Sequence, residues 1–468
     1  MADPTPAPKK LGLSQVSLIF ACGTALFSDG YANGVIGSVN TILRRLYPDA
    51  IKQHDYGTTL SSLAFAGTIV GMQMSATLIV AVFSFLSACS AGAHGSTGGM
   101  LAMLSACRQV GAEYPSGSVA ASEQSEEEGI AKNAQHRWFA LATNTMIDTG
   151  FVISAFTPLV LLWIFGENHL RAVWRGSLGL GTIPALAVLV WRLRMSEPTR
   201  YRQDSMRNAK TPYLLIVRRY WKSLAAISIT CRFIYDFITY PFGIYSSTVV
   251  DSIIGGTDSL YVIFGWNVVI NLFYIPGTLT GAFIVDFLGP KYTMIVGLLC
   301  QAIIGFGMSG GYEYLKNHIA GFAVLYGIFL SFGELGPGNC LGLLASKSGP
   351  TAVRGQFYGI AAAIGKVGAF VGTWAFPPMI DAFGGASSTR GNTGPFWVGS
   401  GLAILSALIT LAFIRPLSHD GMMDEDAKFR EYLAKHGYDT SKMGAASTGD
   451  VDSVEAQTLG TEKEKGSM

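Results

Sequence analysis

Long apolar segments without charged residues constrain the fold of this chain more than any other feature. A spanning helix needs roughly 20 mostly apolar residues. Nine segments meet that test, at about 17–40, 138–165, 173–195, 223–250, 261–285, 291–312, 319–346, 353–383 and 395–415. A shorter candidate lies near 97–121. The sequence therefore predicts an all-α protein that crosses a lipid bilayer many times.

The composition excludes several other classes of protein. Charged residues make up 14% of the chain, whereas an ordinary soluble protein has about 25%. The net charge of +2 argues against binding to nucleic acid. The 6 cysteines lie in apolar segments without paired spacing, so we expect no disulfide framework, no metal site and no cofactor. An enzyme is a poor alternative, because no nucleophile elbow or phosphate-cradling glycine loop is present.

Charge bias predicts the orientation and the division of the chain. The connection after the sixth span is rich in Arg and Lys, which favours the cytoplasm, whereas the acidic connection 251–258 favours the outside. Both termini are then cytoplasmic, and we expect a plasma-membrane location. The expected parts are an N-terminal transmembrane half, a basic central loop, a C-terminal transmembrane half and a disordered cytoplasmic tail, at 1–195, 196–222, 223–415 and 416–468.

Internal repetition indicates two similar halves of six helices each. The segment from Gly67 to Gly71 resembles that from Gly277 to Gly281, and Asp29 has a counterpart in Asp236. Further pairs at separations of about 218 to 221 residues are Glu113 with Glu334 and Asp148 with Lys366.

The uncharged stretch from Gly57 to Gly92 does not fit this symmetry. It is too long for one spanning helix and too short for two with a loop. The charged turn that follows Gly281 in the second half has no equivalent after Gly71. We therefore expect 12 spans, with a truncated hairpin at the second and third.

Ionisable residues inside the apolar spans are the candidates for function. Each costs about 2.5–3.5 kcal/mol on insertion scales, so such residues are rare unless function or pairing retains them. At least seven are present: Asp29, Glu113, Asp148, Arg232, Asp236, Glu334 and Lys366. The aromatic residues of the seventh and eighth spans are expected mostly to pack or to face lipid; they are Tyr235, Phe237, Phe242, Tyr245, Phe264, Trp266, Phe273 and Tyr274.

The residues around Lys366 suggest an anion site. Its ammonium, flanked by Gly365 and Gly368, suits a phosphate group in a dry cavity. The alternative is a Lys paired to a carboxylate only to join two helices. Arg232, Asp236 and Tyr240 share one helical face at i, i+4 and i+8.

Several motifs resemble those of the major facilitator superfamily. The segment from Gly281 through Asp286 and Gly289 to Lys291 resembles its signature in the cytoplasmic loop between spans eight and nine. Long segments resemble proton-coupled phosphate and glycerophosphodiester symporters, in particular a fungal glycerophosphoinositol permease-like branch; they are FSDGYANG at 27–34, GAEYPSGSVAASE at 111–123, RFIYDFITYPFGIYSS at 232–247 and GKVGAFVG at 365–372. The resemblance covers roughly residues 12–444.

The resemblance implies roles for these residues. Lys366 would bind the anion, helped by Tyr114, Tyr240 and Asn339. Asp29, Glu113 and Asp236 would couple protons. Arg232 departs from the Trp of the phosphate symporters, and would either bind a phosphodiester or only neutralise Asp236. Asp148, where those symporters carry Gln, would bind a hydroxyl group or pair with Lys366, and Glu334 is either a proton site or a partner of Arg232.

We therefore expect a monomeric proton-coupled importer of an anionic phosphate compound, with glycerophosphoinositol as the first substrate. Inorganic phosphate is the alternative within this class. A non-transporting sensor or inactive paralogue is the alternative outside it, supported by the lost turn after Gly71. The Gly336-Pro337-Gly338 run must interrupt regular helical hydrogen bonding, which is tolerated at membrane depth mainly where it lines a cavity.

Overall fold

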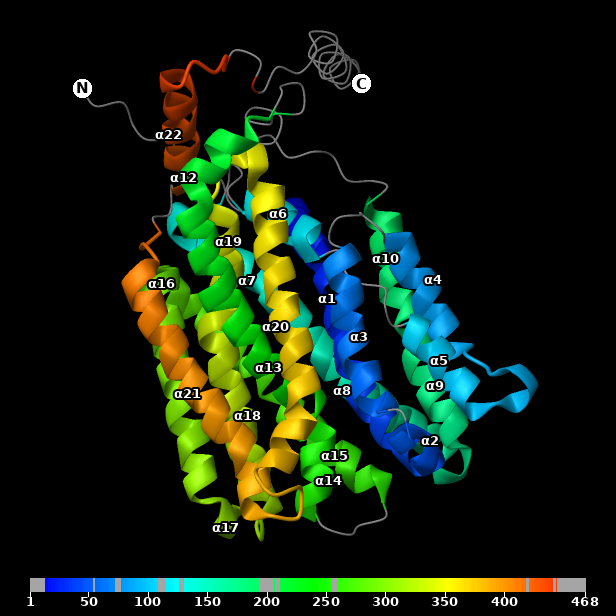
Figure 1. The fold of residues 1–468 in the computed structure, drawn as a ribbon. Helices are drawn as coiled ribbons and strands as arrows, with labels where there is room; N and C mark the ends of the chain where they lie inside the picture. The colour runs from blue at the N-terminus through cyan, green and yellow to red at the C-terminus, as the bar shows by residue number, and fades with distance from the viewer. Residues whose placement is uncertain are drawn as a thin grey trace.

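The chain folds as a bundle of helices (Figure 1). The computed structural model describes residues 13–53, 55–71, 77–107, 114–125, 130–192, 206, 211–254, 259–417, 421–440 and 443. Among these residues, 6 helical segments are long and apolar enough to cross a membrane: Gln135–Phe165, Glu167–Trp191, Leu260–Gly310, Ile319–Lys347, Thr351–Ala382 and Thr389–Phe413. The prediction of an all-α protein is confirmed.

The first half of the chain forms the following main helices: α1 (Leu13–Leu46), α2 (Pro48–Gln53), α3 (Tyr56–Gly71), α4 (Thr77–Ala88), α5 (Thr97–Cys107), α6 (Tyr114–Gln124), α7 (Gln135–Ala142), α8 (Asn144–Phe165), α9 (Leu170–Leu180) and α10 (Thr182–Arg192). Within this half α1 packs along α8, and α4 packs against α9 and α10.

The second half contains α12 (Tyr213–Ala225), η4 (Ala226–Phe233), α13 (Ile234–Ile244), α14 (Ser246–Ile254), α15 (Leu260–Leu272), α16 (Tyr274–Gly310), α17 (Tyr312–Leu315), α18 (Ile319–Gly333), η5 (Glu334–Gly338), α19 (Asn339–Lys347), α20 (Arg354–Ala382), α21 (Thr389–Phe413) and α22 (Gly421–Lys435). Here α16 packs against α18 and α21, and α20 packs along α13.

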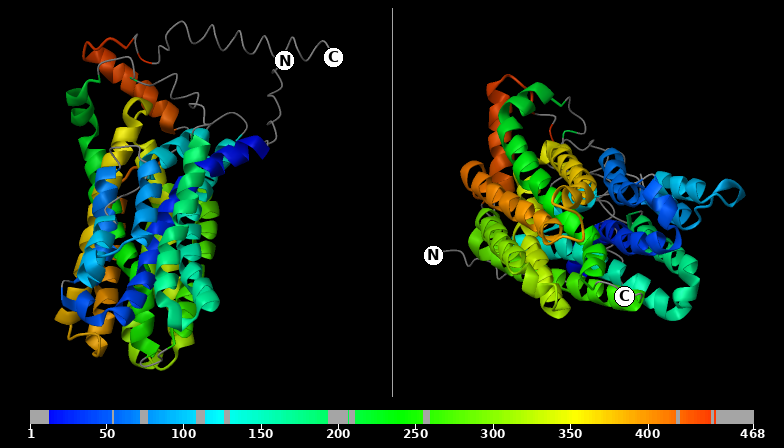
Figure 2. Two further views of the ribbon diagram at one scale, coloured as in Figure 1. Left: turned by 90° about the vertical axis from the view of Figure 1, so that its right-hand side faces the viewer. Right: turned by 60° about the horizontal axis from the view of Figure 1, so that its bottom comes forward.

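The two halves meet where helices of one half pack against helices of the other. α3 packs against α20, and α8 packs against α15. The first turns of α1 and the helix α22 lie at one end of the bundle, whereas α2 and α17 lie at the other (Figures 1 and 2). We call these the α22 end and the α17 end. The arrangement leaves α8 and α13 facing each other across the centre.

The region expected to be a truncated hairpin forms two short helices rather than one long one. α3 has 16 residues and α4 has 12, so both are shorter than a regular span of roughly 20 residues. Residues 72–76, where the lost turn was placed, lie outside the described residues. α3 contacts α20 and α4 contacts α9 and α10, so the two helices still take separate positions in the bundle.

The long helix α16 contains two of the expected spans, separated by a backbone break. Gly289 has φ 75° and ψ 161°, a conformation that favours glycine, and Pro290 follows it. On either side of the break, Asp286 bonds the backbone N–H of Arg137 at 3.1 Å, and the Lys291 ammonium donates to the carbonyl of Leu411 at 2.9 Å. The predicted signature loop is thus a sharp turn, although Gly281 lies well inside the helix before it.

The structure corrects the expected boundaries of the loop and the tail. The basic loop was placed at 196–222, but α12 begins at Tyr213 and its helix continues towards the membrane-spanning residues. The tail was expected to be disordered from 416, but α22 forms within it. Phe429 and Leu433 explain this helix, because both are buried against the bundle. A sparse apolar stripe on a mostly charged helix is hard to distinguish from a disordered tail by composition.

Close packing at Gly281 gives a stability prediction. A Cβ atom there would collide with the carbonyl oxygen of Leu335 and the side-chain amide of Asn339. Gly281→Ala is therefore expected to destabilise the folded protein by about 1–3 kcal/mol, the usual cost of overpacking. Gly265→Ala is the matched control, because a Cβ in that α15 position meets no atom within 4 Å. Thermal unfolding of the two purified variants in detergent measures the difference, and equal midpoints would contradict the prediction.

Candidate functional site

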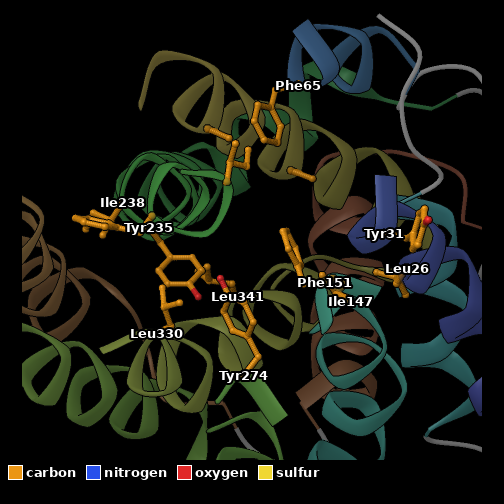
Figure 3. Close-up of a cluster of buried hydrophobic side chains, with 14 of the residues drawn as sticks. Leu26, Tyr31, Phe65, Ile147, Phe151, Tyr235, Ile238, Tyr274, Leu330 and Leu341 are labelled. Atoms are coloured by element: carbon orange, nitrogen blue, oxygen red, sulfur yellow. The ribbon is translucent and has the colours of Figure 1, made fainter. Parts of the chain in front are cut away.

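A small cavity of about 40 Å³ lies between the two halves at the middle of the bundle. The first half contributes residues of α8, and the second half contributes residues of η4, α13, α16, η5 and α19. Its lining is formed by Asn144, Ile147, Asp148, Phe151, Arg232, Tyr235, Asp236, Thr239, Tyr240, Tyr274, Glu334, Gly338 and Leu341. Figure 3 shows several of these side chains converging from different helices.

One side of the cavity carries positive charge. Arg232 is 3% exposed, and its Nη2 donates to the phenol oxygen of Tyr358 at 2.9 Å. The guanidinium also lies over the Tyr358 ring, 5.1 Å from its centroid. Asp236, one helical turn further on, interacts electrostatically with Arg232 and Lys366. These contacts hold the guanidinium of Arg232 at the cavity wall.

Lys366 lies immediately behind this wall. Its ammonium donates a hydrogen bond to the hydroxyl of Tyr240, which itself lines the cavity. The same ammonium is 3.9 Å from the centroid of the Tyr240 ring and 5.6 Å from that of Phe65. It interacts electrostatically with Asp29 on α1 and with Asp236. The structure therefore brings together Asp29, Arg232, Asp236, Tyr240 and Lys366, as the sequence predicted.

The cavity lining also carries the carboxyl groups of Glu334 and Asp148. Glu334 Oε2 accepts from the amide of Asn144 at 3.0 Å, and Glu334 Oε1 accepts from the hydroxyl of Tyr235 at 2.9 Å. The Asn144 amide is also 3.4 Å from Asp148 Oδ2. Asp148 and Glu334 interact electrostatically, and the Asn144 amide contacts both carboxyl groups. The two acids therefore act as a pair, whereas Asp148 had been expected to bind a hydroxyl or to pair with Lys366.

Aromatic residues close the space between the two sides. The rings of Phe151 and Tyr240 are 6.3 Å apart, and those of Phe151 and Tyr274 are 5.7 Å apart. Tyr235 and Tyr274 reach the cavity from α13 and α16 (Figure 3). Both were among the aromatic residues expected mostly to pack or to face lipid; both are buried in the core, and both also line the cavity. That Tyr274 lies near Glu334 becomes visible only once the helices are placed.

Asn339 takes a different position from the one expected of a direct ligand. Its amide donates to the carbonyl of Thr278 at 2.8 Å, and its side-chain oxygen accepts from the Thr278 hydroxyl at 3.3 Å. It does not belong to the cavity lining described above. In this state Asn339 joins α16 to α19, so a role in binding remains a prediction.

Two other predicted residues cannot be placed around the cavity. Glu113 lies outside the described residues, and Tyr114 begins α6 with a side chain that is not described. Both remain predictions.

Two charged residues of the cavity lining, Arg232 and Glu334, lie in π-helical segments rather than in regular α-helix. The predicted interruption at Gly336-Pro337-Gly338 is confirmed, because this segment forms the π-helix η5 that begins at Glu334. A second π-helix, η4, was not predicted and contains Arg232. π-Helical turns inside α-helices frequently occur at functional sites. Here they place Arg232 and Glu334 at the cavity.

Side-chain contacts join the two halves towards both ends of the bundle. At the α17 end, the hydroxyls of Thr41 and Ser247 are 3.2 Å apart. At the α22 end, Arg354 Nη1 donates to Glu123 Oε1 at 3.2 Å, and Arg137 Nε is 3.7 Å from Asp286 Oδ2. The two halves therefore contact each other towards both ends of the bundle, with the charged cavity between these contacts.

Comparison with known proteins agrees with this architecture. Residues 203–419 match the family described as "Sugar (and other) transporter". Over 95% of its length, the chain is 41% identical to the major glycerophosphoinositol permease of Candida albicans, of which it covers 86%. The chain belongs to the major facilitator superfamily. Members of this family are transporters and not enzymes, and the resemblance drawn from the motifs is confirmed.

Two further matches describe the sequence branch and the fold. The glycerophosphocholine permease of Candida albicans is also 41% identical, with coverage of 95% of this chain and 87% of the permease. The solved structure of the proton:xylose symporter XylE from E. coli matches with a TM-score of 0.66. The match covers 89% of this chain and 98% of XylE at 17% identity, so it shows the shared major facilitator fold alone.

Proposed function

We propose that this member of the major facilitator superfamily imports a glycerophosphodiester together with protons. The observation that carries the proposal is the cavity between the two halves, which Arg232, Asp148 and Glu334 line together. Relatives of 41% identity are permeases for such diesters. A cation and several acids buried at membrane depth are costly, and are retained where they bind substrates or relay protons.

The phosphate group would bind on the positive side of the cavity. The Arg232 guanidinium lines the wall and offers paired donors to phosphate oxygens. The Tyr240 hydroxyl adds a further donor, and the ammonium of Lys366 behind it strengthens the local positive field. Tyr114 and Asn339 would orient the substrate once the cavity opens.

Protons would be coupled through the carboxyl groups that surround this anion site. Asp29 and Asp236 interact electrostatically with each other and with Lys366. When ionised, they oppose the entry of an anion. Protonation removes that repulsion, so binding of protons and binding of the diester favour each other, which is the reciprocal coupling a symporter requires. Glu113 and Glu334 are the further proposed proton sites.

Rocking of the two halves would move the substrate across the membrane. We place the α22 end in the cytoplasm of a plasma-membrane protein, because α12, with the basic residues Arg218, Arg219 and Lys222, lies at that end (Figure 1). Inward release then requires separation of Arg354 from Glu123, and outward opening requires separation of Thr41 from Ser247.

Uptake in cells that lack their own carriers tests the proposal. Labelled glycerophosphoinositol, glycerophosphocholine and inorganic phosphate would be offered at pH 5 and pH 7. We expect uptake of a diester that is several-fold faster at pH 5, and that collapses when a protonophore removes the proton gradient.

Two outcomes would contradict this function. Uptake of phosphate without any diester would indicate a phosphate symporter. A surface-exposed protein that takes up none of the three compounds would indicate a sensor or an inactive paralogue, and would make the short α3 and α4 the first region to repair.

A further inference from the structure

We infer that Arg44, in the last turn of α1, is a first binding site for the anionic substrate, reached before the contact between Thr41 and Ser247 opens. This inference rests on the proposed function and deepens it, because it adds a position on the route from the α17 end to the cavity. The ligand is the phosphodiester anion, whose oxygens match the paired N–H donors of a guanidinium.

The position of Arg44 on α1 supplies the first observation. α1 begins at the α22 end, so its last turn, with Arg44, lies towards the α17 end (Figure 1). Gly37, Thr41 and Arg44 follow at i, i+4 and i+7, and therefore share one face of the helix. A Cβ at Gly37 would be 2.2 Å from the carbonyl oxygen of Ile244. The Thr41 hydroxyl is 3.2 Å from that of Ser247. Arg44 is thus the next residue on the face that packs against the second half.

The guanidinium of Arg44 lies against the first turn of α3. A Cβ at Gly57 would be 3.4 Å from Arg44 Nη2 and 3.6 Å from Arg44 Nε. In the second half, the Tyr245 hydroxyl donates to the carbonyl of Thr373 on α20 at 3.2 Å, and this hydroxyl interacts electrostatically with Arg44. The guanidinium therefore lies near the line along which the two halves meet at the α17 end.

Arg44 is accessible while the halves are in contact. Its side chain is exposed, and none of the ion pairs in the part of the chain that the structure describes includes it. Arg232 and Lys366, by contrast, are 3% and 1% exposed. An anion that approaches from the α17 end therefore meets Arg44 before it can reach either of the buried cations.

α3 extends from Arg44 to the cation behind the cavity wall. Gly57, beside Arg44, and Phe65 are eight residues apart on this helix. The ammonium of Lys366 is 5.6 Å from the centroid of the Phe65 ring. Eight residues of α-helix rise by about 12 Å and turn the last position only about 80° from the first. Once the halves separate at the α17 end, a phosphate group at Arg44 therefore has a second cation a short distance further along the same helix.

A cation in this position acts mainly on capture of the substrate. Favourable charge beside an entrance raises the association rate of an oppositely charged ligand by about 10- to 1,000-fold, and the gain decreases with ionic strength. The distance over which such a charge acts falls from about 30 Å at 0.01 M salt to about 8 Å at 0.15 M. Arg44 is not among the residues that line the cavity. Its removal should therefore change kcat/KM and leave kcat nearly unchanged.

The test measures initial uptake by Arg44→Gln at several external ionic strengths, normalised to surface protein. The substrate is labelled glycerophosphoinositol or glycerophosphocholine, whichever the wild type takes up faster. We expect kcat/KM to fall about five- to tenfold at about 10 mM salt, with kcat within about twofold of the wild type. At about 150 mM salt the loss should shrink to about twofold, because the charge is screened. Arg44→Lys keeps the charge and should stay close to the wild type throughout.

Arg390→Gln is the matched control. Arg390 is exposed and lies in the first turn of α21, where the neighbouring Thr389 bonds Glu313 of α17. α21 packs against α16 and α20 of the second half. The control thus removes one positive charge from the same end of the protein, but away from the contact between α1 and α13. We expect its kcat/KM to match that of the wild type at each ionic strength.

Contrary results have distinct meanings. Equal kcat/KM in Arg44→Gln and the wild type, or equal losses in Arg44→Gln and Arg390→Gln, would overturn the capture site. A lower kcat, or a loss of kcat/KM that ionic strength does not change and Arg44→Lys shares, would show that Arg44 only supports the structure at the α17 end. In all these cases the proposed function stands, because the wild type transports the diester. Absence of diester uptake by the wild type would overturn the proposed function and the capture site together.

Discussion

Lys366→Ala is expected to reduce uptake of every anionic substrate by about 100-fold or more at equal surface expression. Lys366 is 1% exposed, and its ammonium bonds the hydroxyl of Tyr240 at the cavity wall. Removal of one partner from a buried charge pair costs about 3–5 kcal/mol, which is more than two orders of magnitude in an equilibrium constant. We expect the lost uptake to reflect weaker binding of the anion, because the carboxylates of Asp29 and Asp236 then outweigh the positive charge at this wall.

The neighbours of Lys366 explain why this change exceeds the others at the site. Asp29 and Asp236 both interact electrostatically with its ammonium. Without it, Arg232 is the remaining cation that the described part of the chain places in interaction with Asp236. An approaching phosphodiester then meets repulsion in a region of low dielectric, where charge interactions are strong.

A double variant separates anion binding from simple charge balance. In Lys366→Ala/Asp236→Asn the buried charges are balanced again, so the folded protein should recover its thermal stability. Binding of the labelled diester to the purified protein, which needs no turnover at the proposed proton site Asp236, should remain close to background, because the cation is still missing. Recovery of binding in the double variant would show instead that Lys366 only neutralises Asp236. Equilibrium binding over a range of diester concentrations, with Asp236→Asn alone as the reference, makes the measurement.

The fold was largely predictable because it depends on local composition. Apolar segments of spanning length identify the helices whatever their partners are. The length of apolar segments did not predict helices that are short or that contain few apolar residues. The short helices α3 and α4 share one uncharged stretch, and α22 stands in a polar tail with only a few apolar residues such as Phe429. In both places the outcome depends on packing against distant helices.

The site was predictable only in part, for a related reason. Charged residues such as Asp236 and Lys366 are conspicuous in an apolar span, so the sequence identified them. Tyr235 and Tyr274 are ordinary residues of apolar helices, and nothing local distinguishes a ring that lines a cavity from one that packs. The pairing of Asp148 with Glu334 likewise depends on how α8 and η5 meet. Spacing along one helix cannot reveal a contact between two.

The second large effect is expected at the α22 end of the bundle, where Arg354→Ala should favour opening of the cavity towards that end. Arg354 lies at the start of α20 and is 1% exposed, and its partner Glu123 on α6 is 4% exposed. The pair therefore joins the two halves across a dry interface. Removal of one partner leaves the other charge buried, which destabilises the arrangement closed at the α22 end by about 3–5 kcal/mol.

α22 strengthens this contact from outside the membrane-spanning helices. Asp426 Oδ1 accepts from the backbone N–H of Thr351 at 2.6 Å, and Asp426 Oδ2 lies 3.9 Å from Arg354 Nη2. On the same helix, Glu425 accepts from the Tyr220 hydroxyl at 2.5 Å. Burial beside Glu425 raises the pKa of Tyr220, so this phenol stays protonated and remains a donor. The helix thus holds α12 and the start of α20 together.

Labelling of a cysteine at a cavity position measures the opening. Thr239 lines the cavity. In a protein without native cysteines, the thiol introduced by Thr239→Cys should react faster with a thiol reagent added on the α22 side when Arg354→Ala is also present. Glu123→Gln should act in the same direction. The control is Glu313→Gln, which breaks the exposed pair with Lys316 near α17 and should change neither labelling nor transport.

The direction of labelling distinguishes a gate from a structural support. A pair that closes one end raises access from that end alone when it is broken, and slows transport because the protein must close there again before it can face outwards. A pair that only stabilises the fold raises access from both ends and lowers the amount of folded protein. Arg354 and Glu123 lie in different halves, and the contact of Thr41 with Ser247 joins the halves separately at the opposite end. We therefore expect Arg354→Ala to raise access to the cavity from the α22 end alone.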